Sequence, residues 1–516
     1  MITRMTADNS VGSAPAAPAR IPHRGGERGR SALLALGHDV HGDGQQEHEA
    51  LDGLHHGGVN THDRQTLVDN THHECTDHSA RDGTNTTGNG RATDEAGGDG
   101  VHLELHTGLS SCGSQTGEHA TKKKETLYAA SVIQKQGFST YIIDISTKNL
   151  VDGADITPVE ILKRYGIEWE DFDPLGKAAS IDVMSKAAAF VLPQLYAEGK
   201  FDVVISIGGG QNAKMAAMAM KTLPFAVPKI VASSLACGSR TMEQYVGDKD
   251  IFVMHTVADI SGLNSITKTV IQSVCSAAMG LAEYAKTFPS EEGKKVLGAT
   301  ELGVTSKGTE NALHMIEESG LFENVVFHAN GVGGRCMENL MREGRIDVAL
   351  DMTLHEITCE TIGGYCVGAN DRLMTAVEHK IPMVVVPGAL DMVDYFINEQ
   401  GEGLPDDIDQ RKKVYHNSSI CHCKIYKEEA EKIVDVVCSR LNQAVSPVTL
   451  VIPAKGCCEA AAPGGPMYDP EVDEVMVDAF KKKIGNNVKL VIVDANINEK
   501  AFSETVAHEV LLLAHE

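Results

Sequence analysis

Long apolar runs and an excess of basic residues are both missing from this chain of 516 residues. No stretch of about 18 or more apolar residues occurs, and the first twenty residues lack the apolar middle of a secretory signal. Lysine and arginine total 46 against 71 aspartate and glutamate, which gives a net charge of -25. A field of that sign repels polyanions, so we expect no nucleic-acid partner. We expect a soluble, cytoplasmic protein with no membrane contact.

Several catalytic and metal-binding signatures are absent as well. The sequence contains no P-loop, no Gly-x-Ser-x-Gly elbow and no His-Glu-x-x-His pattern; His355-Glu356 comes closest to the last, but Cys359 replaces the second histidine. Twelve cysteines, most of them isolated in apolar stretches, favour reduced thiols over a disulfide framework. Neither Cys421-His422-Cys423 nor Cys457-Cys458 has the spacing of a closed zinc site, so we predict no metal.

The composition changes sharply near residue 120. Of the 22 histidines, 13 lie between His23 and His119, mixed with glycine, aspartate, threonine and arginine. Such a segment buries too little apolar surface to offset its ordering entropy, so we predict that residues 1–120 form a disordered tail. The histidines between His55 and His78 lack a regular ligand spacing, which argues against metal binding there.

From Thr121 onward, short β-branched runs alternate with longer amphipathic stretches, as in βαβ units. A polar break near residue 290 divides this region, which predicts an α/β protein with two Rossmann-like doubly wound parallel-sheet subdomains, residues 121–290 and 291–516. The expected strands are Ser139–Ile145, Asp202–Ile207, Lys229–Ser233 and Asp250–Val257 in the first, and Val296–Gly303, Asn324–Ala329, Asp347–Met352, Pro382–Pro387, Pro447–Pro453 and Val488–Asp494 in the second.

The strand at Asp202–Ile207 runs into Gly208, Gly209, Gly210 and Gln211 and then an Ala/Met-rich helix. Unpaired amides at a helix start carry a partial positive charge, and glycine lets the backbone touch a phosphate. The same glycines would also let helix and strand pack closely without any ligand. Gln211 and Asn212 at the helix entrance favour the ligand interpretation.

A second loop has the same order: the strand ending at Ala329, then Asn330, Gly331, Val332, Gly333, Gly334 and Arg335. Arg335 at the helix start would add charge-assisted hydrogen bonds to phosphate, although it would equally suit a solvated surface. His328, just before the loop, is as readily a satisfied core histidine as a ligand contact.

Two further strand ends carry candidates. Thr305, Ser306 and Lys307 precede a helix and would bind phosphate oxygens or cap that helix. Asp391 lies just beyond another strand and suits a ribose hydroxyl, a magnesium-bound water or a helix cap. Micromolar affinity needs about 8 kcal/mol, more than one loop supplies, so at least two loops should meet in one crevice between the subdomains.

These patterns predict a nucleotide-binding protein with the ligand on glycine-rich loops. Two alternatives stay open. One is an enzyme acting on a small phosphorylated or carboxylated metabolite, with His328, His355 or Glu356 as acid or base. The other is a protein-interaction module in which the nucleotide is only structural.

Several blocks together resemble the Tm-1-like ATP-binding family, which has plant, bacterial and fungal members. The matching stretches, in chain order, are Ile205–Gln211, Pro228–Gly238, Tyr245–Gly247 with Asp250–Ile251, Asp259–Asn264, Phe327–Glu338 and Val385–Met392. The resemblance covers about Thr121 to the end. It implies two Rossmann-like subdomains, binding of ATP with or without Mg²⁺, self-association as a homo-oligomer and cytosolic residence.

The chain departs from that family at one point. The family opens with a strand that runs into Gly-Thr-x-Asp-Thr-Lys, whereas this chain has Gly117-Glu-His-Ala-Thr-Lys122. We therefore hypothesise that residues before about Ala120 come from a misassigned exon or reading frame, and that the first sheet lacks one strand. Val101–His106 would be a partial substitute for that strand.

Overall fold

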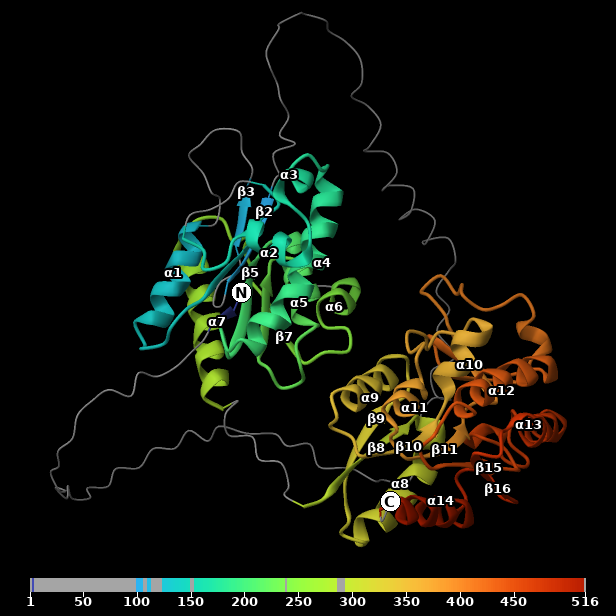
Figure 1. The fold of residues 1–516 in the computed structure, drawn as a ribbon. Helices are drawn as coiled ribbons and strands as arrows, with labels where there is room; N and C mark the ends of the chain where they lie inside the picture. Colours follow the sequence, from blue (N-terminus) through green and yellow to red (C-terminus); the bar gives the residue numbers. More distant parts are fainter. Residues whose placement is uncertain are drawn as a thin grey trace, which may run out of the picture. The chain divides into compact units, whose positions relative to one another are not determined.

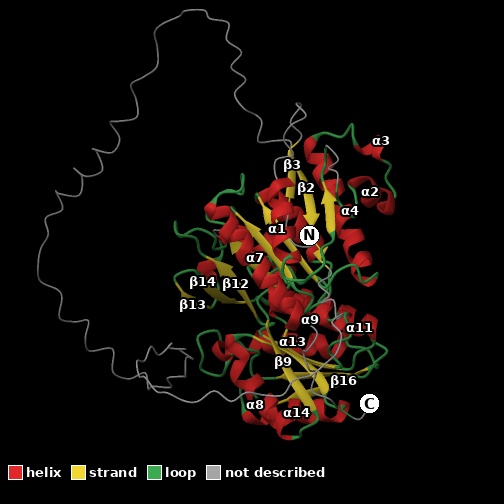
Figure 2. Ribbon diagram, turned by 90° about the vertical axis from the view of Figure 1, so that its left-hand side faces the viewer, coloured by secondary structure: helices red, strands yellow, loops and turns green. Residues whose placement is uncertain are grey.

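The computed structural model describes residues 2–3, 99–104, 109–112, 123–148, 153–236, 239–284 and 293–514. The predicted disordered tail, residues 1–120, lies outside these ranges except for three short strands. The described residues form two large sheets and one small one, with helices against both large sheets (Figures 1 and 2).

The first sheet is built around three parallel strands, β5 (Val203–Gly208), β6 (Lys229–Ser233) and β7 (Ile251–His255). Every residue of β5 and β6 is buried, which explains why the sequence of each strand is mostly apolar, without alternation of polar residues. Four further strands join this sheet within the described residues: β1 (Ile2–Thr3), β2 (Asp99–Glu104), β3 (Leu109–Cys112) and β4 (Ile142–Ile145).

Strand β2 lies between β4 and β5 and pairs with both in the antiparallel direction. It overlaps Val101–His106, the segment expected to replace a missing strand, over residues 101–104, and it begins two residues earlier, at Asp99. The sequence at 105–108 and 113–122 lies outside the described residues, so the junction near Ala120 is not part of the structure described.

Local capping signals explain where helices of the first half begin and end. For example, Thr157 caps helix α2 through its hydroxyl, Glu160 completes the capping box, and Gly166 ends the helix in the left-handed conformation. The helices are α1 (Lys123–Gln134), α2 (Pro158–Tyr165), α3 (Trp169–Phe172), α4 (Lys177–Ala197), α5 (Gly210–Met220), α6 (Ser239–Tyr245) and α7 (Ser265–Tyr284).

The second large sheet is wholly parallel, with strand order β16-β15-β11-β10-β8-β9. The order reverses between β8 and β10, which defines a topological switch point at the carboxyl ends of those strands. The strands are β8 (Lys295–Glu301), β9 (Phe322–His328), β10 (Val348–Thr353), β11 (Met383–Gly388), β15 (Val448–Pro453) and β16 (Val488–Val493).

Helices cover both faces of this sheet and enclose two apolar cores. One face packs against α8 (Ser306–Glu318) and α14 (Lys500–Leu513). The other packs against α9, α10, α11, α12 and α13, which span Val332–Arg342, His355–Ile362, Met374–His379, Lys427–Leu441 and Pro470–Lys483. The prediction of doubly wound α/β architecture is confirmed.

A small antiparallel sheet was not predicted. It consists of β12 (Met392–Phe396), β13 (Lys413–Asn417) and β14 (Ile420–Lys424), with β14 in the centre. Its strands are short, and the prediction considered only parallel strands separated by helices. This sheet brings Asp394 and His422 close to the first turns of α10.

No helix in the described part of the chain has both the length and the hydrophobicity needed to cross a bilayer. The nine cysteines whose side chains are described are free thiols.

Candidate functional site

The loop between β5 and α5 leaves the first amides of the helix unused. Gly209 is the N-cap residue, without a side-chain capping bond, and the first bond of the helix runs from Ala213 N to Gly209 O, 3.0 Å. The amides of Gly210, Gln211 and Asn212 precede this first bond in the chain. Among the described residues no side chain accepts a hydrogen bond from these three amides, so the positive end of α5 is free for an external anion.

Asn212 adds a second polar group at this turn. Its side chain is buried, folds back over Gly208 so that a Cβ there would overlap it, and donates from Nδ2 to Ile207 O, 3.3 Å. Its Oδ1 atom is buried with no hydrogen-bond partner. An unpaired buried oxygen costs about 1–3 kcal/mol, so this atom is available to a hydrogen-bond donor from outside the chain.

The loop between β9 and α9 differs, because the protein itself supplies the anion. Glu356 Oε1 accepts from Gly331 N at 2.7 Å and from Gly334 N at 3.0 Å. Glu356 is completely buried. The amides of Gly331 and Gly334, which were predicted to bind a phosphate, therefore bind an internal carboxylate.

Close packing explains the glycines of this second loop. A Cβ on Gly333 would overlap the carbonyl of His328, and one on Gly334 would overlap the Glu356 carboxylate. Gly331 has φ +100°, a conformation that favours glycine. Here the alternative interpretation of a glycine turn, close internal packing, fits the contacts observed.

Arg372 lies at the centre of the same buried region. Its guanidinium makes two bonds to Asp351, one of 2.6 Å to Glu356 and one of 3.3 Å to Glu338, and it also donates to Thr353 O. Burial alone would lower the pKa of Arg372, but the Asp351 and Glu356 carboxylates outweigh it and raise that pKa. Burial raises the pKa of Glu338, and Arg372 offsets part of this rise. The network lies at the carboxyl end of β10, next to the switch point, since Asp351 and Thr353 belong to that strand.

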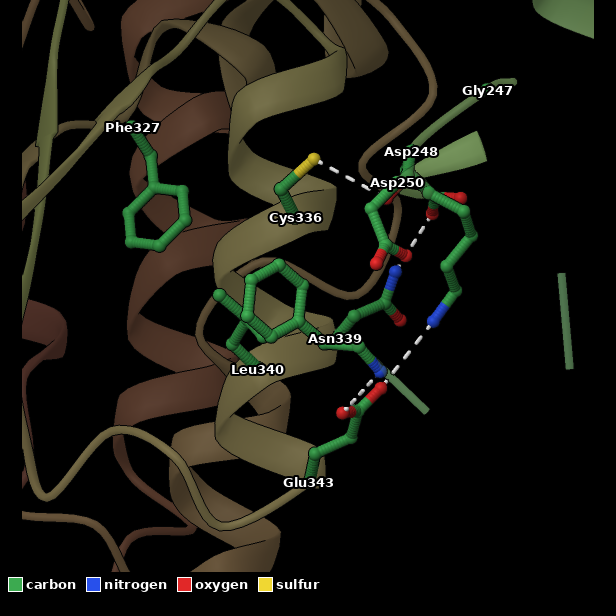
Figure 3. Close-up of a pocket in the computed structure, with 10 residues that line it drawn as sticks. Gly247, Asp248, Asp250, Phe327, Cys336, Asn339, Leu340 and Glu343 are labelled. Atoms are coloured by element: carbon green, nitrogen blue, oxygen red, sulfur yellow. Dashed lines mark hydrogen bonds and ion pairs between the residues drawn. The ribbon is translucent and has the colours of Figure 1, made fainter. Parts of the chain in front are cut away.

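Arg335 pairs with carboxylates of the first half of the chain. Its Nη2 lies 3.2 Å from Glu243 Oε1, and its Nε lies 3.7 Å from Asp248 Oδ2. Figure 3 shows the adjoining pocket of about 350 Å³ along α9, where Asn339 Nδ2 donates to the same Asp248 carboxylate at 2.8 Å. Within the described residues, Arg335 thus has acidic neighbours rather than an open anion site.

The third loop is divided between the interior and a pocket. Thr305 is fully buried and shares a 2.8 Å hydrogen bond with Thr353 Oγ1. Lys307 lines a pocket of about 450 Å³, together with Gly303, Glu459, Ala462, Pro463, Asn496, Asn498 and Glu499. Two glutamates on the wall of that pocket make it a poor site for a phosphate.

Asp391, the fourth candidate, is fully buried and bonds to Lys424 Nζ at 2.8 Å. Lys424 is also 2.7 Å from Asp473 Oδ1. Burial, with the negative charge of Asp391, raises the pKa of Asp473 to about 6, whereas the two aspartates raise the pKa of Lys424. Asp391 therefore neutralises an internal lysine and does not face solvent.

The three catalytic candidates are in contrasting environments. His328 is exposed at the end of β9, whereas His355 and Glu356 are completely buried at the start of α10. A substrate would not reach the last two without movement of the surrounding chain.

His355 belongs to a buried cluster with Cys359, Cys366 and Asp394. Burial would lower the pKa of His355, but Cys359 and Asp394 raise it overall. The Cys366 thiol is the main cause of a pKa of about 4 for Cys359, with a further contribution from His355 and against the effect of burial. Imidazole, thiol and carboxylate groups thus meet out of contact with solvent.

The predicted site residues fall into separate environments. Gly208, Gly209, Gly210 and Gln211 lie at the junction of β5 and α5, and Gly331, Gly333 and Gly334 lie at the junction of β9 and α9. Glu356 of α10 binds the second junction, and Thr305 and Asp391 each bond to interior side chains. Five buried charged residues were not predicted from the sequence: Arg372, Glu338, Asp351, Lys424 and Asp394. The one sequence signal for such residues is a charged residue inside an apolar stretch, such as Asp351 within Val348–Thr353.

Comparison with known proteins places the chain among relatives. A model described as the N-terminal domain of the uncharacterised protein family UPF0261 matches residues 116–287, and the C-terminal domain model matches residues 294–514. The chain belongs to this family. A UPF0261 protein of Clostridium tetani is 33% identical over 396 residues, which is 76% of this chain and 96% of the relative.

Other UPF0261 relatives come from bacteria and a plant. A protein of Mesorhizobium japonicum is 28% identical over 395 residues, covering 75% of this chain and 95% of its own length. The ToMV resistance protein Tm-1(GCR237) of Solanum lycopersicum is 31% identical over 341 residues, covering 65% of this chain and 44% of the tomato protein. The resemblance to the Tm-1-like family is confirmed.

Proposed function

We propose that this UPF0261 protein binds a phosphate-bearing small molecule, a nucleotide such as ATP, at the start of α5. The observation that carries the proposal is the contrast between the two glycine loops. The amides of Gly331 and Gly334 hold the Glu356 carboxylate, whereas those of Gly210, Gln211 and Asn212 have no side-chain acceptor among the described residues. A phosphate would take the place that Glu356 has in the other loop.

The surroundings of the β5–α5 loop support a nucleotide. The loop lies at the carboxyl edge of three parallel strands, where open α/β sheets bind ligands. The buried Oδ1 of Asn212 would accept a hydrogen bond from a hydroxyl or amino group of the ligand. ATP as the particular nucleotide follows from the family resemblance, and Mg²⁺ would arrive with its phosphates.

Substituting Gln211→Glu tests the site with little risk to folding. An acidic residue in the first turn stabilises a helix but repels a phosphate, so Q211E should remain folded and bind ATP at least about tenfold more weakly, equivalent to about 1.4 kcal/mol. The measurement is calorimetric titration of the full chain with ATP and Mg²⁺.

Arg335→Gln is the control at the other glycine loop and should leave the affinity for ATP unchanged. Equal affinity in Q211E and the wild type, or failure of the wild type to bind any phosphorylated compound, contradicts the proposal. Incubation of the same samples with ATP, followed by assay of released phosphate, separates an enzyme from a binding module. Homo-oligomerisation and cytoplasmic location belong to the same proposal and rest on the family resemblance.

A further inference from the structure

The cluster at the start of α10 has a geometry that nucleotide binding does not explain. His355 and Cys359 are four residues apart on α10 and therefore on one face of the helix. Gly363, at φ 88°, ends the helix in the left-handed conformation, and the chain turns back to bring Cys366 to Cys359. His355 Nε2 and the two sulfur atoms all lie within 4.8 Å of one another.

Asp394, on β12, brings a carboxylate to the same point. Its Oδ2 lies 3.2 Å from His355 Nε2 and 3.9 Å from Cys366 Sγ, while Cys359 Sγ lies 3.4 Å from that nitrogen. Zinc bonds of about 2.3 Å to sulfur and about 2.0–2.2 Å to nitrogen or oxygen place tetrahedral ligand atoms about 3.3–3.8 Å apart. The three measured separations are within a few tenths of an ångström of that range.

A catalytic Cys-His-Asp triad would be arranged differently. In a triad the nucleophile and the carboxylate bind opposite nitrogens of the imidazole. Here Cys359 and Asp394 both approach Nε2, and Nδ1 faces Ala389 O at 3.2 Å. Both sulfur atoms belong to buried residues, which removes them from any substrate.

The neighbouring contacts suit a metal ligand set. The Ala389 carbonyl can only accept, so it holds the proton on His355 Nδ1 and leaves the Nε2 lone pair free to coordinate. His422 Nδ1 lies 2.5 Å from Asp394 Oδ1, the oxygen that faces away from the cluster. A Cβ on Gly364 would overlap Cys359 Sγ, so glycine there leaves room for the sulfur.

We propose that His355, Cys359 and Cys366 bind one zinc ion, with Asp394 as the fourth ligand. Two thiolates and an imidazole favour zinc over magnesium or calcium, which prefer oxygen. The ligands come from α10, the turn that follows it and β12, so the ion would join the small antiparallel sheet to the large domain. All four residues are buried, as in a structural site with no open position for substrate.

No metal was predicted from the sequence because the proposed ligands lack the short, regular cysteine and histidine spacing of closed zinc sites. The proposed ligands have the spacing His-x3-Cys-x6-Cys followed by an aspartate 28 residues later. The cysteine motifs at Cys421–Cys423 and Cys457–Cys458 contribute none of the four, whereas His355 and Cys359 had been set aside as an incomplete His-Glu-x-x-His pattern.

Metal analysis of the full chain tests this site. The protein is expressed in zinc-supplemented cells, purified without metal-affinity steps and treated with a mild chelator. It should then retain about one zinc per chain. Cys359→Ser should reduce that to near zero, whereas Cys438→Ser, a buried cysteine on α12 outside the cluster, should retain it. The chelator step removes metal held weakly by the histidine-rich segment.

Cobalt spectroscopy keeps the test valid if the cysteine variants fail to fold. The wild type loaded with Co²⁺ should show a thiolate-to-cobalt charge-transfer band and the intense visible bands of tetrahedral cobalt. Asp394→Asn should retain the charge-transfer band and shift the visible bands, because it changes one oxygen ligand. A folded wild type with no retained zinc and no thiolate-to-cobalt band overturns the proposal, as does equal zinc in C359S and C438S.

Discussion

Replacing Arg372 by methionine should lower the free energy of unfolding by about 3–5 kcal/mol, because the change leaves buried carboxylates without their cation. Asp351, Glu356 and Glu338 all bond to this guanidinium, and all are almost completely buried. Methionine fills much of the same volume, so the loss would come from charge rather than from a cavity. Urea unfolding of the full chain, followed by circular dichroism, measures it.

Arg342→Met is the matched control on the same side of the sheet. Arg342 pairs with Asp371 at 2.7 Å, but both side chains are nearly half exposed, so the substitution should cost less than about 1 kcal/mol. If R372M is as stable as R342M, the buried carboxylates do not need the charge of Arg372, and the proposed stabilisation by this network is wrong.

Replacing Lys424 by methionine should have a similarly large effect, about 3–5 kcal/mol at neutral pH, because Asp391 and Asp473 would remain buried without a cation. The effect should depend on pH. Burial already raises the pKa of Asp473 to about 6, and removal of Lys424 raises it further. At a pH between the pKa of Asp473 in the unfolded chain and its higher pKa in the folded variant, Asp473 is protonated only in the folded state. Protonation then favours folding, so the stability of K424M relative to wild type increases as the pH falls from 7 to 5.

Lys427→Met separates this effect from a general loss of lysine. Lys427 also pairs with an acidic residue, Glu471, but both side chains are exposed. K427M should therefore match the wild type at both pH values. A K424M variant whose loss of stability is the same at pH 5 and pH 7 would show that the two aspartates do not take up protons.

The large sheets were predictable because their signals are local. Buried parallel strands such as β5, β6 and β15 are continuous apolar runs, and each lies within two residues of its predicted bounds. The small sheet was missed because β12 pairs with β14 across an intervening segment and β13, although β13 and β14 are adjacent in the chain. Nothing in the local pattern specifies that β12 pairs with β14.

The candidate sites were harder to predict, for a reason that the two glycine loops illustrate. Both have a strand, glycines and a helix in the same order, and both offer amides to an anion. Whether the anion is internal depends on Glu356, which enters from α10 more than twenty residues away. Arg372 and Lys424 were missed for the same reason, since their partners come from distant parts of the chain.

Hydrogen exchange of the full chain, with and without ATP and Mg²⁺, tests the central claim most directly. Binding at α5 would slow exchange of the amides of Gly210, Gln211 and Asn212, whereas those of Gly331 and Gly334 are already bonded to Glu356 and should not change. Protection of the second loop alone, or of neither loop at saturating nucleotide, would contradict the account.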